Sequence, residues 1–327
     1  MSHYSPVVAA LVTMLLTILI LISKFGKEIQ DIPNERSLHD APVPRIGGVA
    51  MMAGLLAGWA LMLTSLMWWI VLPLIGLFIV SLLDDMHNLP VRTRLLAHLM
   101  AAVILVFGSG ILGQYGLPVA LLALLITVWM TNLYNFMDGS DGLAGGMALF
   151  GFTMYGVAAL MSNDDTQAML NFTIGAAALG FLYNNFHPAK VFMGDAGSIP
   201  LGFLAAGMGL WGWQQGHWAA WFPLLVFSPF IVDASVTLVK RTLRGAKITE
   251  PHREHYYQRL IQMGWSHRSV ALIEYILMLA AGAGGLAYVK QGWPWALLLV
   301  WGAIYTVLIF ILDFMWKKRC SKLDMVE

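Results

Sequence analysis

Six acidic or amide side chains stand out because glycine, asparagine and proline surround them, rather than the lysine, glutamate and serine of a solvated loop. They are Asp84, Asp85, Asn135, Asp138, Asp141 and Asp195. Oxygen ligands of this kind suit a hard divalent cation, and Mg²⁺ takes one or two carboxylates and completes its shell with phosphate and water. The pattern predicts cation-assisted chemistry on a phosphate-bearing substrate.

Three of these residues, Asn135, Asp138 and Asp141, recur at every third position. On a helical turn this spacing places all three on one face. The segment runs through Gly142 into a further apolar stretch, and the exposed amides at a helix start attract an anion such as phosphate. Capping that helix needs one aspartate, so two aspartates with an asparagine indicate a binding site.

The pair Asp84-Asp85 ends an apolar stretch. The C-terminal end of a helix disfavours negative charge, so we expect a compensating cation there. A bound divalent metal could supply it, as could Arg92 or Arg94. Neighbouring residues on a helix point about 100° apart, so only one of the two acids faces a given atom.

Two glycine-containing segments precede predicted helix starts. Asp195 lies before one of them, with Ser198 as a candidate N-cap, so its carboxylate is placed to hold a cation. Arg45 lies before the other, in a loop too rich in proline to be helical. Together with the amides of Gly47-Gly48, Arg45 is a candidate phosphate ligand.

A basic segment follows later in the chain and ends in His252-Arg253-Glu254-His255. On a helix, His252, His255 and Arg259 would share a face suited to an anionic ligand. The histidine spacing does not match a zinc motif. Ordinary charge on a cytoplasmic loop explains the preceding run of basic residues, but not the paired histidines. That run comprises Lys240, Arg241, Arg244 and Lys247.

The elements that must position these residues are membrane helices. The chain has 327 residues, of which 59% are apolar and 11% charged, which excludes an ordinary soluble domain. None of its apolar stretches alternates like a barrel strand, so we expect an all-α polytopic protein with about eleven spans. The stretches are 6–23, 46–65, 67–83, 95–112, 117–134, 143–161, 168–186, 199–213, 218–238, 269–289 and 294–316. A net charge of +1 indicates no nucleic-acid partner, and the single cysteine, Cys320, excludes an internal disulfide.

The distribution of basic residues predicts the orientation. With the N-terminus outside and the C-terminus inside, all of the 19 lysines and arginines except Lys290 fall on one side. The positive-inside rule makes that side cytoplasmic. We expect a single transmembrane domain, 1–327, whose site is built from loops on this side. These loops are 24–45, 84–94, 135–142, 187–198 and 239–268.

Five short segments now occur in order on one predicted face. They are Pro44–Gly48, Asp84-Asp85, Asn135–Leu143, Val191–Ser198 and His252–His255. In this the chain resembles the bacterial polyprenyl-phosphate N-acetylhexosamine-1-phosphate transferases, over about residues 34–260. The resemblance implies transfer of a sugar-1-phosphate from a UDP-amino sugar to undecaprenyl phosphate, with release of UMP. It also implies Mg²⁺, or Mn²⁺ in its place, an inner-membrane location with a cytoplasmic active site, and room for a homodimer.

The resemblance also implies roles for individual residues. Asp84 and Asp85 match the paired acids that act on the lipid phosphate, and Asp195 matches the Mg²⁺ ligand. The nucleotide pocket would be lined by Asn135, Asp138, Asp141, Asn185, Lys190 and Phe192. The donor's diphosphate and sugar would face His252, Arg253 and His255. Members that make the peptidoglycan precursor carry three successive histidines and usually ten spans, so the present sequence favours the branch that begins O-antigen or a related surface glycan.

Three other functions fit the sequence less well. A transporter places its polar groups near the bilayer midplane, whereas the acids here gather at one mouth. A Mg²⁺-dependent membrane prenyltransferase typically carries two motifs of the Asp-x-x-x-Asp kind, and this chain has an Asp pair and Asp-x-x-Asp. An intramembrane aspartyl protease carries Gly-x-Gly-Asp, but position 192 is Phe192. Within the transferase, direct attack and a covalent intermediate both remain open, and we favour direct attack.

Overall fold

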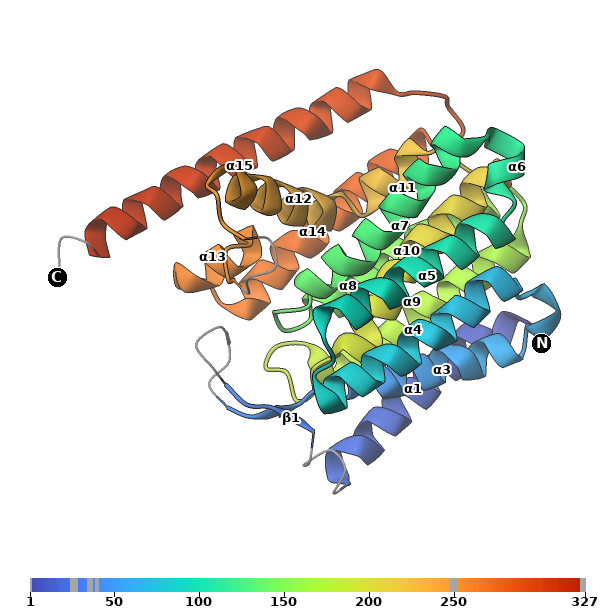
Figure 1. Ribbon diagram of the computed structural model, residues 1–327, viewed down its shortest axis with the longest axis horizontal. Coiled ribbons are helices and arrows are strands. Elements are labelled where there is room, and N and C mark those ends of the chain that lie inside the picture. Colours follow the sequence, from blue (N-terminus) through green and yellow to red (C-terminus); the bar gives the residue numbers. More distant parts are fainter. Residues whose placement is uncertain (1, 24–28, 34–37, 39–40, 248–251, 324–327) are drawn as a thin grey trace.

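The computed structural model describes residues 2–23, 29–33, 38, 41–247 and 252–323, so parts of the predicted loops 24–45 and 239–268 lie outside the described residues. The described chain is a bundle of helices (Figure 1). Its first half contains η1 (Ser2–Tyr4), α1 (Ser5–Ile22), α3 (Gly47–Ala60), η2 (Leu63–Ser65), α4 (Trp68–His87), α5 (Val91–Gly108), α6 (Ile111–Tyr115) and α7 (Leu117–Phe136). Its second half contains α8 (Leu143–Leu160), α9 (Asp165–Asn185), α10 (Asp195–Gln214), α11 (Trp221–Val226), α12 (Ser228–Leu243), α13 (Tyr256–Gln262), α14 (His267–Ala287) and α15 (Trp295–Leu323).

Each of the apolar stretches predicted from the sequence is occupied by helix. Seven helices, namely α1, α4, α5, α7, α8, α14 and α15, are long and apolar enough to cross a bilayer, and α3 is a shorter apolar helix. The protein is therefore a helical, multi-pass membrane protein. The start of α1 and the end of α15 lie at opposite ends of the bundle (Figure 1), as an odd number of crossings requires. The count of eleven and the orientation stay predictions.

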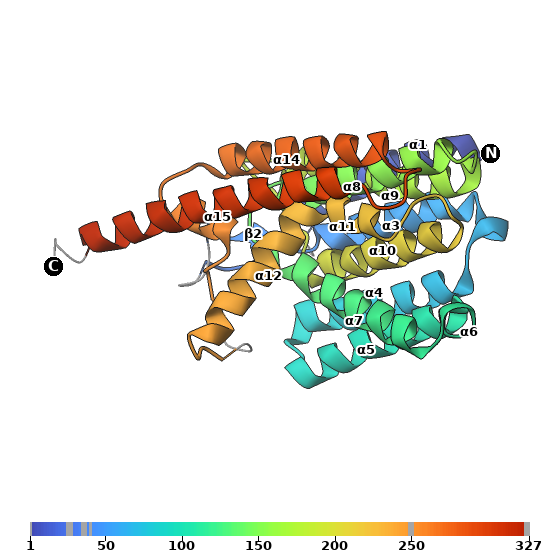
Figure 2. The ribbon, with the colours of Figure 1, turned by 90° about the horizontal axis from the view of Figure 1, so that it is seen from above.

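The ninth predicted stretch, 218–238, is two helices rather than one. α11 ends at Val226 and α12 begins at Ser228. Pro229 has no N–H to offer the carbonyl of Leu225, and the hydroxyl of Ser228 donates to that carbonyl instead, at 2.6 Å. After this break, α12 leaves the bundle at an angle (Figure 2).

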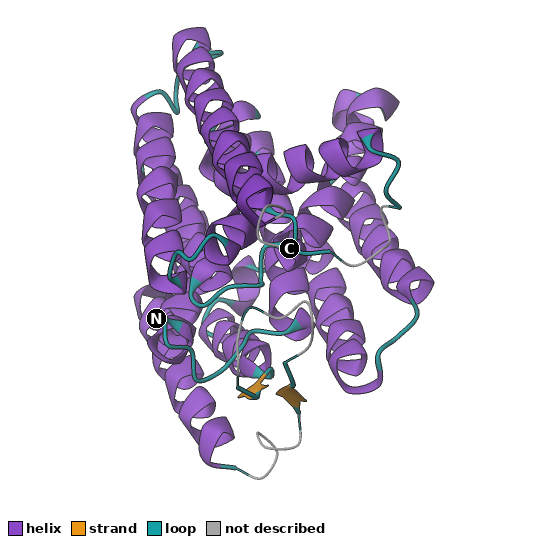
Figure 3. Ribbon diagram, turned by 90° about the vertical axis from the view of Figure 1, so that its left-hand side faces the viewer, coloured by secondary structure: helices purple, strands orange, loops and turns teal. Residues whose placement is uncertain are grey.

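The described part of the first loop is not helical, as its prolines predict, and it contains a short β-hairpin. Strand β1 (Gln30–Asp31) pairs antiparallel with β2 (Val43–Pro44), with Gln30 opposite Pro44 and Asp31 opposite Val43. Figure 3 shows these two strands among the loops at one end of the molecule. The hairpin ends directly before α3 and so sets where that helix begins.

Beyond β2 the chain docks on the segment before α10 by main-chain hydrogen bonds. Phe192 N donates to Pro44 O at 2.7 Å, and Gly47 N and Gly48 N donate to the carbonyls of Phe192 (2.9 Å) and Met193 (2.8 Å). A Cβ atom on Gly48 would overlap the backbone of Gly197, so the close approach requires glycine. The prediction that the Gly47-Gly48 amides meet phosphate is wrong, because both amides already have protein partners.

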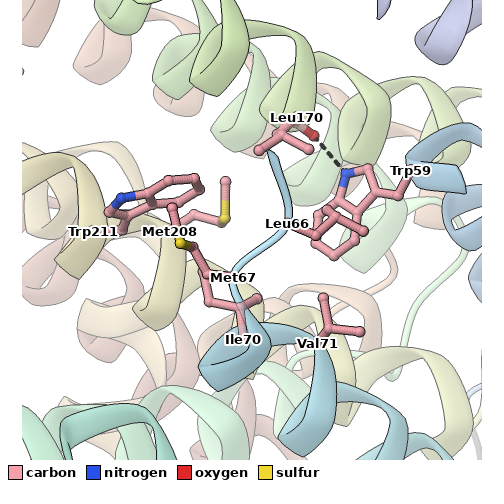
Figure 4. A pocket seen from close by; sticks show the side chains of 8 residues that line it. All are labelled: Trp59, Leu66, Met67, Ile70, Val71, Leu170, Met208 and Trp211. Atoms are coloured by element: carbon pink, nitrogen blue, oxygen red, sulfur yellow. Dashed lines mark hydrogen bonds between the residues drawn. The ribbon is translucent and has the colours of Figure 1, made fainter. Parts of the chain in front are cut away.

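The opposite end of α3 is closed by apolar side chains. Trp59 Nε1 donates to Leu170 O at 3.2 Å, beside a cavity of about 10 Å³ that Met67, Met208 and Trp211 also line (Figure 4). A space of this size is at the lower limit for one water molecule and has almost no polar lining. This cavity is therefore part of the apolar packing between the helices and is too small for a substrate.

Candidate active site

Polar residues from distant parts of the chain meet at the end of the bundle that carries the β-hairpin. The turns after α4, α7 and α9 all lie at this end (Figure 1). A cavity of about 210 Å³ lies beside the turn after α4. Its lining consists of Arg45, Asp84, Asp85, Asn88, Leu89, Arg94 and Asp195.

Asp84 and Asp195 share one arginine. Arg94 Nη1 lies 2.9 Å from Asp84 Oδ2 and 3.5 Å from Asp195 Oδ2. The other oxygen of Asp84 accepts from Leu89 N at 2.6 Å. The expected compensating cation is thus Arg94, at the start of α5, whereas Arg92 is exposed. The only sequence signal for Arg94 was its position in the first turn of the helix that follows the acid pair.

Asp85 contacts different partners from Asp84, because neighbouring residues on a helix point about 100° apart. Its Oδ1 accepts from Asp195 N at 3.2 Å and its Oδ2 from Ala196 N at 2.9 Å, so it caps the start of α10. Arg45 Nη2 donates to the main-chain oxygen of Asp85 at 2.7 Å. The prediction that Ser198 is the N-cap is wrong, because α10 begins at Asp195.

Asn135 and Asp138 join the same cluster. Asn135 Nδ2 donates to Asp195 Oδ1 at 2.9 Å and to Ser198 Oγ at 3.0 Å. Asp138 is half-buried in the turn after α7. Burial raises the pKa of the Asp138 carboxyl well above its usual range, and the charges of Asp195 and Asp85 raise it further. The predicted convergence of aspartates from three separate segments is confirmed.

Asp141 does not share a face with Asn135 and Asp138. α7 ends at Phe136, so the three-residue spacing does not continue along a helix. Asp141 Oδ2 instead lies 2.7 Å from His187 Nδ1 and accepts from Ala189 N at 3.1 Å. It therefore joins the turn after α7 to the turn after α9, and its predicted contact with the nucleotide stays a prediction.

A second histidine completes this connection. The rings of His187 and His267 stack, with centroids 5.6 Å apart and planes 3° from parallel. His267 Nε2 lies 3.0 Å from Leu38 O, and its Nδ1 lies 3.0 Å from Ser140 Oγ. Sequence reasoning missed both histidines, since each lies among residues without a motif and their partners are far away in the chain.

The residues expected beside the nucleotide lie in the same region. Asn185 accepts from Gly142 N at 3.0 Å and donates to Val191 O at 2.9 Å, so its side chain fixes both turns. Lys190 is exposed and Phe192 is half-buried. These residues lie in the end of α9 and in the turn that leads into α10. Their roles toward a nucleotide stay predictions.

The histidine segment is arranged differently from the expectation. α13 begins at Tyr256 with His255 as its N-cap, so His252, His255 and Arg259 do not share a helix face. His255 is buried, and its Nδ1 lies 3.2 Å from Asp233 Oδ1. Asp233 was not foreseen. Its carboxylate also accepts from the first two amides of α13, at 2.8 Å and 3.0 Å.

This segment contacts the turn after α7. The ring of His255 lies over that of Phe136, with centroids 6.2 Å apart, and Tyr257 Oη donates to Phe136 O at 3.0 Å. Burial lowers the pKa of His252 to about 4, and the charges of His255 and Arg241 lower it further. Arg253 is exposed and makes no ion pair within the described ranges. The histidine segment thus borders the acidic cluster through α7.

Comparison with known proteins identifies the family. The model of "Glycosyl transferase family 4" matches residues 67–212, which include Asp84, Asp85, Asp138 and Asp195. A decaprenyl-phosphate N-acetylglucosaminephosphotransferase of Mycobacterium tuberculosis is 32% identical, over 75% of this chain and 72% of that protein. The chain belongs to this family. As one of the polyprenyl-phosphate N-acetylhexosamine-1-phosphate transferases, it is an enzyme, a phosphosugar transferase.

Two further relatives show how wide this transferase family is. A probable undecaprenyl-phosphate N-acetylglucosaminyl 1-phosphate transferase of Bacillus subtilis is 29% identical, over 93% of this chain and 90% of that protein. A phospho-N-acetylmuramoyl-pentapeptide-transferase of Pelotomaculum thermopropionicum is also 29% identical, over 81% of this chain and 89% of that protein. These relatives carry the names of phosphosugar transferases and lend no support to a transporter, prenyltransferase or protease.

The transferase's acidic cluster fits a cation that arrives with phosphate. Within the described part of the chain, no three His, Cys, Asp or Glu side chains are grouped to hold a metal by themselves. Asp84 and Asp195 nevertheless supply two hard oxygen donors beside the 210 Å³ cavity. Mg²⁺ is usually held by one or two carboxylates, substrate phosphates and water, and this cavity supplies the carboxylates of that donor set.

Proposed function

We propose that this transferase moves an N-acetylhexosamine-1-phosphate, or that of a deoxy relative such as N-acetylfucosamine, from a UDP-sugar to undecaprenyl phosphate. The products would be UMP and the first lipid-linked sugar of a surface glycan such as O-antigen. The observation that carries the proposal is the meeting of Asp84, Asp85 and Asp195 with Arg45 and Arg94 at one cavity, with Asp138 near enough for the charges of Asp195 and Asp85 to act on it. We also propose Mg²⁺ as the cofactor, with Mn²⁺ as a substitute.

The reaction exchanges one phosphoanhydride for another. An oxygen of the lipid phosphate forms a bond to the β-phosphorus of the donor, and the bond from that phosphorus to the bridging oxygen breaks. UMP leaves with the bridging oxygen, so no ATP is needed. The two substrates bring several negative charges together, and Arg45 and Arg94 offset their repulsion. Mg²⁺, held by Asp195 and by phosphate oxygens of the substrates, would supply further charge neutralisation on the diphosphate.

The two neighbouring acids divide the work. Asp84 lines the cavity and is the residue that we propose accepts the proton of the lipid phosphate. Asp85 also lines the cavity, but its two oxygens accept from amides of α10 and so fix the position of Asp195. A carboxylate that attacked phosphorus would give up one of these contacts, whereas a proton needs only a free lone pair. This supports direct attack by the lipid phosphate.

The donor is proposed from the relatives and the histidine segment together. Relatives named for N-acetylglucosamine-1-phosphate transfer match long parts of this chain, and His-Arg-Glu-His replaces three successive histidines. We therefore propose an N-acetylglucosamine-type donor. Purified protein with undecaprenyl phosphate and a panel of UDP-amino sugars should release UMP. Release only with a muramoyl-pentapeptide donor would refute the branch, and donor-independent uptake of a solute into vesicles would favour a transporter.

Direct attack is tested by leaving out the lipid. Incubation with labelled UDP-sugar alone should yield neither UMP nor labelled protein. A phosphosugar bound to the protein, trapped under these conditions, would establish a covalent route instead. The same incubation repeated with Asp84→Asn would show whether Asp84 carried that label.

We further propose a single domain of eleven spans in the bacterial inner membrane, with the site facing the cytoplasm. A homodimer is compatible with this arrangement. The single cysteine, Cys320, tests the orientation, since it lies in the last turn of α15. A membrane-impermeant maleimide should label it in inside-out vesicles and not in right-side-out vesicles. The reverse result would invert the topology.

A further inference from the structure

The last helix, α15, contacts the rest of the described chain at two polar points. Most of its side chains are exposed, while Trp301 and Tyr305 are buried. Tyr305 Oη lies 2.6 Å from Ser228 Oγ at the start of α12. The second point, Asp313, lies two turns further along α15. No sequence motif accounts for a carboxylate on this helix, so the role of Asp313 has to be found from its contacts.

Asp313 holds three groups from other helices. Its Oδ1 accepts from Arg259 Nη1 and from Tyr256 Oη, both at 3.2 Å, and its Oδ2 pairs with Lys240 Nζ. Lys240 Nζ also donates to Tyr256 Oη, at 2.7 Å. The Arg259 guanidinium lies 5.1 Å from the centroid of the Tyr256 ring and 5.6 Å from that of Trp316. One carboxylate on α15 therefore fixes α13 against α12.

The other side of α13 faces the site. His255 caps the helix, and Tyr257 Oη donates to Phe136 O, two residues before Asp138. A side chain on Gly139 would overlap the Tyr257 hydroxyl, so the turn after α7 lies directly against α13. α13 is thus held from outside by Asp313 and meets the acidic cluster on its inner side.

Charge explains why Asp313 is needed. Arg241 and Arg259 are buried, and both pair with Glu254. Arg259 is also 3.2 Å from Asp313, whereas Glu254 is 3.8 Å away from it. Without Asp313, Glu254 alone would pair with these cations among the described residues. A buried cation that loses the nearer of its two counter-ions is destabilised, so Arg259 would move toward water and take α13 with it.

We propose that Asp313 is a positioning residue that holds α13, and with it the histidine segment His252–His255, in place for the sugar-nucleotide donor. This inference rests on the proposed function for the identity of the ligand. The positioning itself rests on the contacts of Asp313 with Lys240, Tyr256 and Arg259.

The test compares Asp313→Asn and Asp313→Glu with the control Lys318→Gln, an exposed position on the same helix. Hydrogen–deuterium exchange of amides 256–262 in the full chain should become faster in Asp313→Asn and stay unchanged in the control. The KM for the UDP-sugar should rise about three- to tenfold, the size that the two ion pairs of the partly exposed Asp313 can supply, while kcat and the KM for undecaprenyl phosphate change less than twofold. In Asp313→Glu, which keeps the negative charge, both the exchange rate and the donor KM should stay close to those of the unsubstituted protein.

Unchanged exchange and unchanged donor KM in Asp313→Asn would overturn the proposal, as would an equal loss for donor and acceptor. If Asp313→Asn does not fold, the milder Tyr256→Phe removes one hydrogen bond to Asp313 and should show the same donor-selective change at smaller size. Absence of UMP release by the unsubstituted protein with every donor would refute the proposed function instead. The exchange measurement would still decide whether Asp313 holds α13.

Discussion

Asp85→Asn separates the two neighbouring acids by their effects on stability. The carboxylate accepts from two amides at the start of α10, at 3.2 Å and 2.9 Å. An asparagine has one acceptor oxygen, so its NH₂ group must face an amide donor. One buried N–H then loses its partner, which costs about 1–3 kcal/mol. The lost negative charge at a helix N-terminus adds about 0.3–1 kcal/mol.

Asp84→Asn supplies the matched comparison. Its remaining oxygen can still accept from Leu89 N, and what it loses is the ion pair with Arg94, whose side chain is 35% exposed. A pair this exposed contributes about 0.2–1 kcal/mol. We therefore expect Asp85→Asn to lower the free energy of unfolding more than Asp84→Asn does. At about 2–4 °C per kcal/mol for a chain of this order of size, the difference in Tm should be a few degrees.

Turnover should fall in both variants, for different reasons. Asp84→Asn removes the proposed proton acceptor, whereas Asp85→Asn displaces Asp195, and a displacement of about 1 Å can cost about a hundredfold in rate. Thermal unfolding in one detergent and UMP release in the same preparation give both quantities. Equal Tm values for the two variants, or wild-type turnover in Asp85→Asn, would refute the capping role of Asp85.

Asp195→Asn should abolish Mg²⁺-dependent UMP release with little change in folding, and near-normal turnover across a Mg²⁺ titration would remove Asp195 from the metal site. His255→Ala removes the side chain at the N-cap of α13 and should reduce kcat/KM for the donor by about tenfold or more, a larger loss than any drop in Tm would explain. Unchanged kinetics would exclude His255 from the site. Gly48→Ala should lower stability by about 1–3 kcal/mol, because its Cβ would overlap the backbone of Gly197 and force α3 away from α10, and a Tm equal to that of the unsubstituted protein would show that this contact is not tight.

Much of the site followed from short stretches of sequence. Asp84 with Asp85, and Asp195 in its glycine-containing segment, mark helix ends, and a charge at a membrane-helix end is a local signal. The need for a cation near the acid pair was also local, and Arg94 meets it. What the sequence left undecided was which of the two acids pairs with Arg94 and which accepts from the first amides of α10, since that depends on where α10 begins.

Other features had no local signal. His187 lies 46 positions from Asp141, and Asp313 lies 54 positions from Arg259, yet each pair is in contact. The split between Asp138 and Asp141 arises because α7 ends at Phe136. Spacing along a chain predicts a shared face only while the helix continues, and the turn that follows is shaped by the segments packed on it.

The sequence by itself determined that this is a helical membrane protein and where its apolar stretches and acidic segments lie, because hydropathy and charge are properties of consecutive residues. The tertiary structure decided that Asp85 caps α10, that Asp141 joins two turns through His187, and that Asp313 holds α13. Each of these contacts joins residues that are distant in the chain. Such contacts depend on how the helices pack against one another, and no stretch of about twenty residues carries that information.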